Sequence, residues 1–112
     1  MTEPKHDTAT TGYTYLWEFL VDAARVVEFE RHYGSEGAWV ALFRRARGYR
    51  GTWLLRDPAN PLRFVTVDRW ESADAYTAFR ANYAGEYAEL DQRCEHLTRR
   101  ETSLGEFHEV GA

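Results

Sequence analysis

The chain has 112 residues, of which 44% are hydrophobic and 15% aromatic, and its formal net charge is −4. This length fits one domain with a single core, and the negative charge argues against a nucleic-acid-binding protein, which would need a basic surface. No apolar run approaches the roughly 20 residues of a membrane-spanning helix, so no membrane partner is expected. The single cysteine, Cys94, excludes an internal disulfide and fits a reducing compartment, most simply the cytoplasm.

The chain begins with a polar segment that gives way to a strand. Residues 1–12 hold no large apolar side chain after the initiator methionine, so we expect a flexible tail before a single domain over residues 13–112. In Tyr13–Val21, large aromatic and aliphatic side chains recur at every second position, which predicts a strand. One face of this strand carries Tyr13, Tyr15, Trp17, Phe19 and Val21.

Two helices and a hairpin are expected next. Asp22 can cap a helix over Ala23–Tyr33, and a second short helix is predicted over Glu36–Ala46. Tyr49–Asp57 and Leu62–Glu71 alternate like strands, and the four residues between them contain two prolines. The pair therefore predicts a β-hairpin.

The C-terminal part completes the predicted fold. Ser72 is expected to cap a helix that runs to about Leu97 with one interruption near Gly85, and a final strand follows over Thr98–Val110. The order β-α-β-β-α-β predicts an α+β, ferredoxin-like fold, with a four-stranded antiparallel sheet and helices on one face. The other face has no cover from its own chain, so we expect a homodimer through this sheet face.

An acid and a tryptophan, Asp68 and Trp70, stand two residues apart on one face of the third predicted strand. If that face is turned to the helices, Asp68 is buried, and an unpaired buried carboxylate is costly. Either an arginine such as Arg50 or Arg99 pairs with it, which we favour, or its pKa rises and it can take a proton from a substrate. If the face meets a partner chain, Asp68 becomes an interface residue. Glu18 is an analogous acid on the neighbouring first strand and could lie close to Asp68.

The strand order, the aromatic first strand and the sequence W-E-S-A-D-A-Y (Trp70–Tyr76) resemble the antibiotic biosynthesis monooxygenase (ABM) family of the dimeric α+β barrel superfamily. The superfamily includes cofactor-free oxygenases of polycyclic phenols, haem-degrading enzymes and isomerases, so the resemblance implies a fold more than a reaction. Trp70 matches a tryptophan that faces the cavity between sheet and helices in the oxygenase and haem-degrading branches. The helix histidine of the haem-degrading branch is absent from Ala78–Tyr87, and so is the first-strand asparagine of several members.

The resemblance implies a cofactor-independent monooxygenase that uses O₂ to oxidise a polyhydroxylated, polyketide-like aromatic metabolite. No nucleotide-binding glycine motif, H-E-x-x-H or cysteine pair is present, so neither a cofactor nor a metal is expected. The candidate bases are Asp68 and His32, and Tyr83 is a candidate hydrogen-bond donor. Aromatic side chains are expected to line the substrate pocket, namely Trp17, Tyr33, Trp39, Phe64, Trp70 and Phe79.

Structural interpretations of these residues stay open. A strand-end tryptophan or a helical tyrosine stripe usually packs in the core, and a lateral helix histidine is usually solvated. Two other functions also stay open. One is a non-catalytic dimer that binds an aromatic metabolite, and the other is an isomerase or cyclase on the same scaffold.

Overall fold

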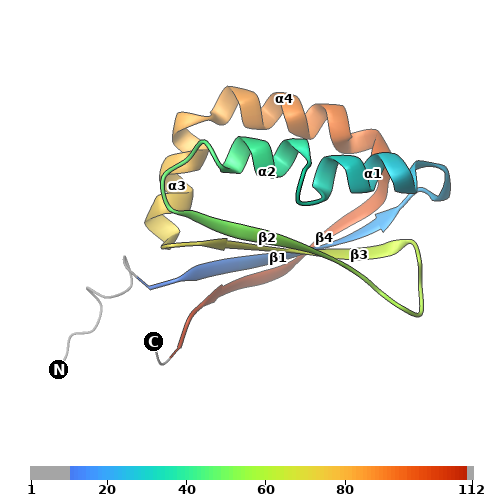
Figure 1. The fold of residues 1–112 in the computed structure, drawn as a ribbon, viewed down its shortest axis with the longest axis horizontal. Helices are drawn as coiled ribbons and strands as arrows, with labels where there is room; N and C mark the ends of the chain where they lie inside the picture. The colour runs from blue at the N-terminus through green and yellow to red at the C-terminus, as the bar shows by residue number, and fades with distance from the viewer. Residues whose placement is uncertain (1–10, 111–112) are drawn as a thin grey trace.

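A computed structural model describes residues 11–110 and has one four-stranded antiparallel sheet with all its helices on one face (Figure 1). The strands are β1 (Tyr13–Val21), β2 (Tyr49–Arg56), β3 (Arg63–Trp70) and β4 (Thr98–His108). The α-helices are α1 (Val26–Tyr33), α2 (Ala38–Phe43), α3 (Ala73–Asn82) and α4 (Ala84–Cys94), and the 3-10 helices are η2 (Ala23–Arg25) and η3 (Glu95–Leu97). The sheet order β2-β3-β1-β4 confirms the predicted ferredoxin-like fold, with an open sheet.

The first ten residues of the expected tail lie outside the described residues, and β1 begins at Tyr13 as predicted. No helix in residues 11–110 combines the length and the apolar character needed to cross a membrane.

Side-chain caps begin two helical segments where the sequence predicted them. The Asp22 carboxylate accepts a 2.9 Å hydrogen bond from the backbone N–H of Ala24, although it caps the 3-10 helix η2 rather than an α-helix. The Ser72 hydroxyl accepts a 3.0 Å bond from the N–H of Ala75 at the start of α3. Each cap satisfies a backbone donor that has no partner within the helix.

The end of α2 and the break before α4 also differ from the prediction. Beyond Phe43, the N–H groups of Arg45 and Ala46 bond carbonyls only three residues back, at 3.1 and 3.0 Å, so α2 closes in tight turns before Ala46. The interruption expected near Gly85 lies at Tyr83, whose φ of −123° separates α3 from α4.

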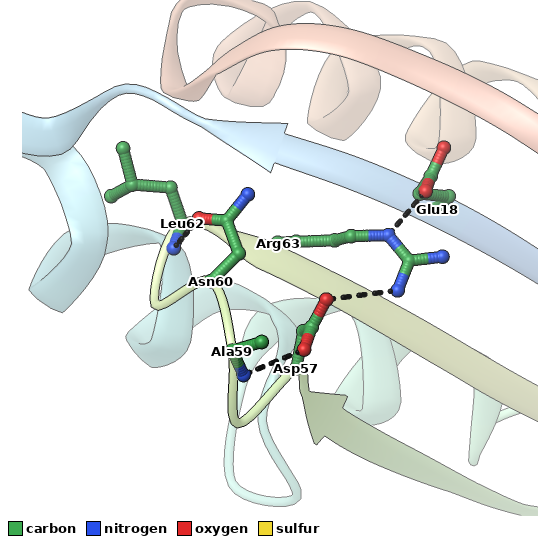
Figure 2. A network of polar contacts seen from close by, with 6 residues as sticks. All are labelled: Glu18, Asp57, Ala59, Asn60, Leu62 and Arg63. Atoms are coloured by element: carbon green, nitrogen blue, oxygen red, sulfur yellow. Dashed lines mark hydrogen bonds and ion pairs between the residues drawn. The ribbon is translucent and has the colours of Figure 1, made fainter.

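An arginine ties the β2–β3 hairpin to β1 (Figure 2). Arg63 Nε donates a 2.5 Å hydrogen bond to Glu18, and its Nη1 donates a 3.2 Å bond to Asp57 at the end of β2. In the turn, Asp57 also accepts a 2.8 Å bond from the N–H of Ala59. The hairpin turn is therefore held by side chains from three segments.

The two faces of the sheet differ in burial. On the inner face, which is turned to the helices, Tyr13, Tyr15 and Phe19 of β1 are buried, as the alternating pattern predicted. On the outer face, Trp53 and Leu55 of β2 are 48% and 50% exposed. No helix of the described chain covers this apolar outer face (Figure 1).

Candidate functional site

Three side chains form a row across the inner face of the sheet. Asp68 of β3 lies opposite Tyr15 of β1 on one side and opposite Thr52 of β2 on the other. The Thr52 hydroxyl donates a 2.5 Å hydrogen bond to Oδ1 of Asp68. Asp68 is only 5% exposed and shares this face with Trp70, as strand parity predicted.

The buried carboxyl group of Asp68 is unusual because no cation neutralises it. Among residues 11–110 no arginine forms an ion pair with Asp68, and Arg50 instead lies 4.0 Å from Glu109. The predicted ion pair with Arg50 or Arg99 is therefore wrong. Burial raises the pKa of Asp68 to about 7, and the Thr52 hydrogen bond offsets only part of this rise. At neutral pH the group can thus either accept or hold a proton.

Glu18 does not join Asp68. Its strand partner is Val65 rather than Asp68, and its carboxylate forms an ion pair with Arg63 on the outer side of the sheet (Figure 2). The expectation that the two acids could lie close together is wrong, since the β1–β3 register sets them on opposite faces.

A cavity of about 300 Å³ lies between the inner face of the sheet and the helices, and Asp68 borders it. Its volume is at the lower end of the range for small-molecule sites. The sheet contributes Tyr15, Trp17, Phe19, Thr52, Thr66 and Asp68, and the helices contribute Tyr33, Trp39, Phe43 and Tyr87. A few polar groups thus stand among aromatic walls, which is typical of a site for a flat aromatic molecule.

Charged side chains form the rim of the cavity. They are Arg80 of α3, Asp91 of α4 and Glu101 of β4, and all three are exposed. Arg80 lies 3.8 Å from the centroid of the Tyr87 ring and donates a 3.0 Å hydrogen bond to the Tyr76 hydroxyl. These two contacts hold the guanidinium at the cavity, where it can donate a hydrogen bond to a polar substituent of a ligand.

The phenols in the cavity remain protonated. Burial raises the pKa of Tyr15 well above its ordinary value, and the nearby charge of Asp68 raises it further. Burial likewise raises the pKa values of Tyr33 and Tyr87. Asp68 is therefore the group in the cavity interior that is suited to exchange protons near neutral pH.

Four of the predicted site residues border the cavity, and five do not. Asp68, Trp17, Tyr33 and Trp39 are brought together there. The other aromatic candidates are core residues, because helix side chains cover them, namely Phe64, Trp70 and Phe79. Trp70 is completely buried, with Phe43 and Phe79 at ring-centroid distances of 5.7 and 5.1 Å. This confirms the core interpretation of Trp70.

His32 and Tyr83 also point to other partners. Nδ1 of His32 lies 2.9 Å from the carbonyl oxygen of Glu28, one turn earlier in α1. The Tyr83 hydroxyl donates a 3.0 Å hydrogen bond to the carbonyl of Arg45, which links the α3–α4 junction to the end of α2. Both residues lie away from the cavity.

Sequence reasoning missed Thr52 and Arg80. Thr52 carries no motif, and only its register opposite Asp68 reveals its role. Arg80 follows Tyr76 by four residues, a helical spacing that could have indicated their contact. Within residues 11–110, no three His, Cys, Asp or Glu side chains gather as metal ligands.

Solved structures share this fold along nearly the whole chain. SnoaB from Streptomyces nogalater, a cofactor-independent oxygenase, is 20% identical with a TM-score of 0.74, covering 91% of this chain and 96% of its own. A candidate antibiotic biosynthesis monooxygenase from Bordetella bronchiseptica is 25% identical with a TM-score of 0.68, covering 89% and 98%. PA3566 from Pseudomonas aeruginosa is 16% identical with a TM-score of 0.70, covering 91% and 97%.

Among curated proteins, none matches this sequence. The family model described as antibiotic biosynthesis monooxygenase matches residues 18–101, which include β3 with Asp68 and most of the cavity walls. The chain therefore belongs to the antibiotic biosynthesis monooxygenase family.

Proposed function

We propose that this protein is a cofactor-independent monooxygenase that oxidises an electron-rich, polyhydroxylated aromatic compound, with Asp68 as the base. The observation that carries the proposal is an unpaired, buried carboxyl group with a pKa of about 7 in an aromatic cavity. A general base works best when its pKa lies near the working pH. Family membership and the fold shared with SnoaB support oxygen chemistry as the reaction class.

The proposed reaction begins with proton transfer from an anthrone or phenol to Asp68. The resulting carbanion or phenolate gives one electron to O₂, and the substrate radical combines with superoxide to form a new C–O bond. The peroxide takes up one proton. For an anthrone, its outer oxygen then leaves as hydroxide, and this hydroxide and the remaining C–H proton form one water molecule and leave a carbonyl. One oxygen atom of O₂ then resides in the product and the other in water.

The cavity walls suit the first step. Trp17, Tyr33 and Trp39 present aromatic surface against which a flat substrate can stack beside Asp68. A substrate seated there displaces water from an already buried carboxylate, which strengthens its interaction with the substrate proton. Arg80 at the rim can meet an oxygen substituent at the outer end of the ring system.

The test is oxidation of anthrone by metal-free protein. The reaction is monitored by oxygen consumption and by incorporation of ¹⁸O from ¹⁸O₂ into the product. We expect one labelled oxygen atom per anthraquinone formed, and we expect Asp68→Asn to abolish most of this activity while retaining the fold. Binding without oxidation, unaffected by Asp68→Asn, would support the alternative of a non-catalytic aromatic-binding dimer. Rearrangement without oxygen uptake would support an isomerase or cyclase that uses the same base.

A homodimer through the outer sheet face is part of this proposal. Apolar side chains from β1, β2 and β3 line this face, namely Leu16, Leu20, Trp53, Leu55, Val65 and Val67. Such an apolar face is removed from water only when a partner packs against it, and a second copy of the same face is the simplest partner.

A further inference from the structure

A second hydroxyl group extends the contact between Thr52 and Asp68. The Tyr49 hydroxyl lies 2.6 Å from Oγ1 of Thr52, which in turn donates its 2.5 Å bond to Oδ1 of Asp68. Since the single Thr52 proton is used on the carboxylate, Tyr49 must be the donor to Thr52 when Asp68 is ionised. The three groups therefore form one directed chain of hydrogen bonds.

A β-bulge makes this chain possible. In a regular strand, residues 49 and 52 would lie on opposite faces, because side chains alternate. The β2–β3 register shifts between Tyr49 and Gly51, so one extra residue is inserted and both Tyr49 and Thr52 face inward. Gly51 has a φ of +139°, a backbone conformation that glycine adopts without strain. Bulges often serve to redirect a side chain beside an active site.

The outer end of the chain reaches a different surface from the mouth of the cavity. Tyr49 and Thr52 both border a groove of about 470 Å³ at the β2 edge, together with Arg44, Arg50 and Trp53. Tyr49 is partly exposed, and its ring is fixed by Phe43 and Trp70 at centroid distances of 5.5 and 5.3 Å. Among residues 11–110, Thr52 alone borders both the groove and the cavity.

We propose that Thr52 and Tyr49 relay protons between Asp68 and solvent in the groove at the β2 edge, and that this relay is the main route by which the buried carboxyl group exchanges its proton with water. The proposal rests on Asp68 as the base in the proposed function. When Asp68 has taken the substrate proton, it passes a proton to Thr52, Thr52 passes its own to Tyr49, and Tyr49 passes its own to water in the groove. Before the transfer the hydroxyl groups turn, so that protonated Asp68 donates to Thr52 and Thr52 to Tyr49. Each oxygen then gains one proton and loses one, so the chain ends with Asp68 ionised and with Tyr49 again donating to Thr52 and Thr52 to Asp68.

The relay would give the buried Asp68 carboxyl group a route to solvent. Asp68 is 5% exposed, and a substrate stacked against Trp17 would block its remaining access to water from the cavity. The peroxide takes up a proton later in the reaction, so the relay is not the only way to restore the base, but it lets Asp68 exchange its proton with solvent independently of the substrate. Thr52 and Tyr49 act through Asp68, so both are positioning residues rather than catalytic ones.

Other titratable groups face the same cavity and must be separated from the relay in any test. They come from five elements and are Tyr15 of β1, Tyr33 of α1, Arg80 of α3, Tyr87 and Asp91 of α4, and Glu101 of β4. No hydrogen bond joins any of these side chains to Asp68 in residues 11–110. The proton chain of Asp68 therefore runs toward β2 and away from the rim.

The experiment observes Asp68 directly in the full chain without a ligand. Carboxyl-¹³C-labelled aspartate gives its titration midpoint from the chemical shift and its proton-exchange rate from line broadening near that midpoint, and Asp68→Asn identifies the signal. We expect Thr52→Val to raise the midpoint by about one pH unit, because the hydrogen bond favours the ionised form. We expect Tyr49→Phe to slow exchange by about 10²-fold, the low end of what a positioned proton-transfer group contributes.

Two further variants serve as controls. Thr52→Ser keeps the hydroxyl and should restore both the midpoint and the exchange rate. Thr66→Val removes another buried cavity hydroxyl that makes no bond to Asp68, and should change neither.

An unchanged exchange rate in Tyr49→Phe overturns the relay, even if Thr52→Val shifts the midpoint, since a hydrogen bond alone would account for that shift. Tyr49→Phe removes a single oxygen atom, so it decides the question even if Thr52→Val fails to fold. Slowed exchange in a protein that oxidises no anthrone would support the relay and contradict the oxygenase, so the two failures are distinguishable.

Discussion

Trp17 and Trp70 share the inner face of the sheet, yet Trp17 is 36% exposed and borders the cavity, whereas Trp70 is completely buried. The difference comes from the helices above them. Phe43 of α2 and Phe79 of α3 pack on Trp70, whereas the space over Trp17 is left open. One tryptophan is therefore available to a ligand, and the other stabilises the core.

This contrast predicts opposite phenotypes for two alanine variants. Trp17→Ala should weaken binding of a hydroxyanthraquinone, measured by calorimetry, with little loss of stability. Trp70→Ala should lower the free energy of unfolding by about 3–5 kcal/mol, because it leaves a large core cavity. Urea unfolding compares the two, and a large stability loss in Trp17→Ala would contradict the open position of its ring.

The unpaired carboxyl group of Asp68 predicts the pH dependence of turnover. A base must be ionised, so the oxidation rate should rise with pH through about pH 7 and level off above it. Asp68→Asn should lower the rate by about 10²–10⁴-fold and remove this rise. Steady-state rates from pH 5 to 9, measured with saturating anthrone, test both expectations. A rate that is independent of pH across this range would exclude Asp68 as the base.

The same group predicts how stability changes with pH. The pKa of Asp68 is about 7 in the folded protein and about 3.9 in an unfolded chain, so the folded state binds one more proton between these values. The stability contribution of Asp68 is therefore greatest at low pH, falls as pH rises from 4 to 7, and is constant above that. The total loss is about 4 kcal/mol.

Asp68→Asn should remove this loss, so its unfolding free energy should exceed that of the natural chain by more at pH 8 than at pH 4. Urea unfolding at the two pH values measures the difference. Thr66→Val alters the same cavity wall without removing a titratable group, and it should leave the pH dependence unchanged. An equal effect of Asp68→Asn at both pH values would contradict a raised pKa.

The apolar outer face of the sheet predicts the oligomeric state. Trp53→Glu places a charge on this face and should convert a dimer to a monomer, as measured by light scattering after size-exclusion chromatography. Val27→Glu is a matched control, because Val27 of α1 is an exposed apolar residue on the helix side. Dissociation by Val27→Glu but not by Trp53→Glu would place the interface on the helices.

Much of the fold could be predicted from local patterns. The alternation in Tyr13–Val21 and the cap at Ser72 were enough to locate β1 and the start of α3. The prediction of α2 extended too far because helix propensity continues through Arg44 and Arg45, while the closing turn depends on the chain reaching β2. Local sequence reports intrinsic preference, and tertiary contacts decide where an element ends.

The amino-acid sequence by itself determined that Asp68 and Trp70 share one face of their strand, because alternation of side chains along a strand follows from covalent geometry. Only the tertiary structure decided that this face is turned to the helices and that no arginine of the described chain pairs with Asp68. It also decided that Trp70 is covered while Trp17 is open, and that a bulge at Gly51 brings Tyr49 to the same face as Thr52. These features depend on register and on the path of helices over the sheet. Both are set by contacts between segments far apart in the chain, which no local period encodes.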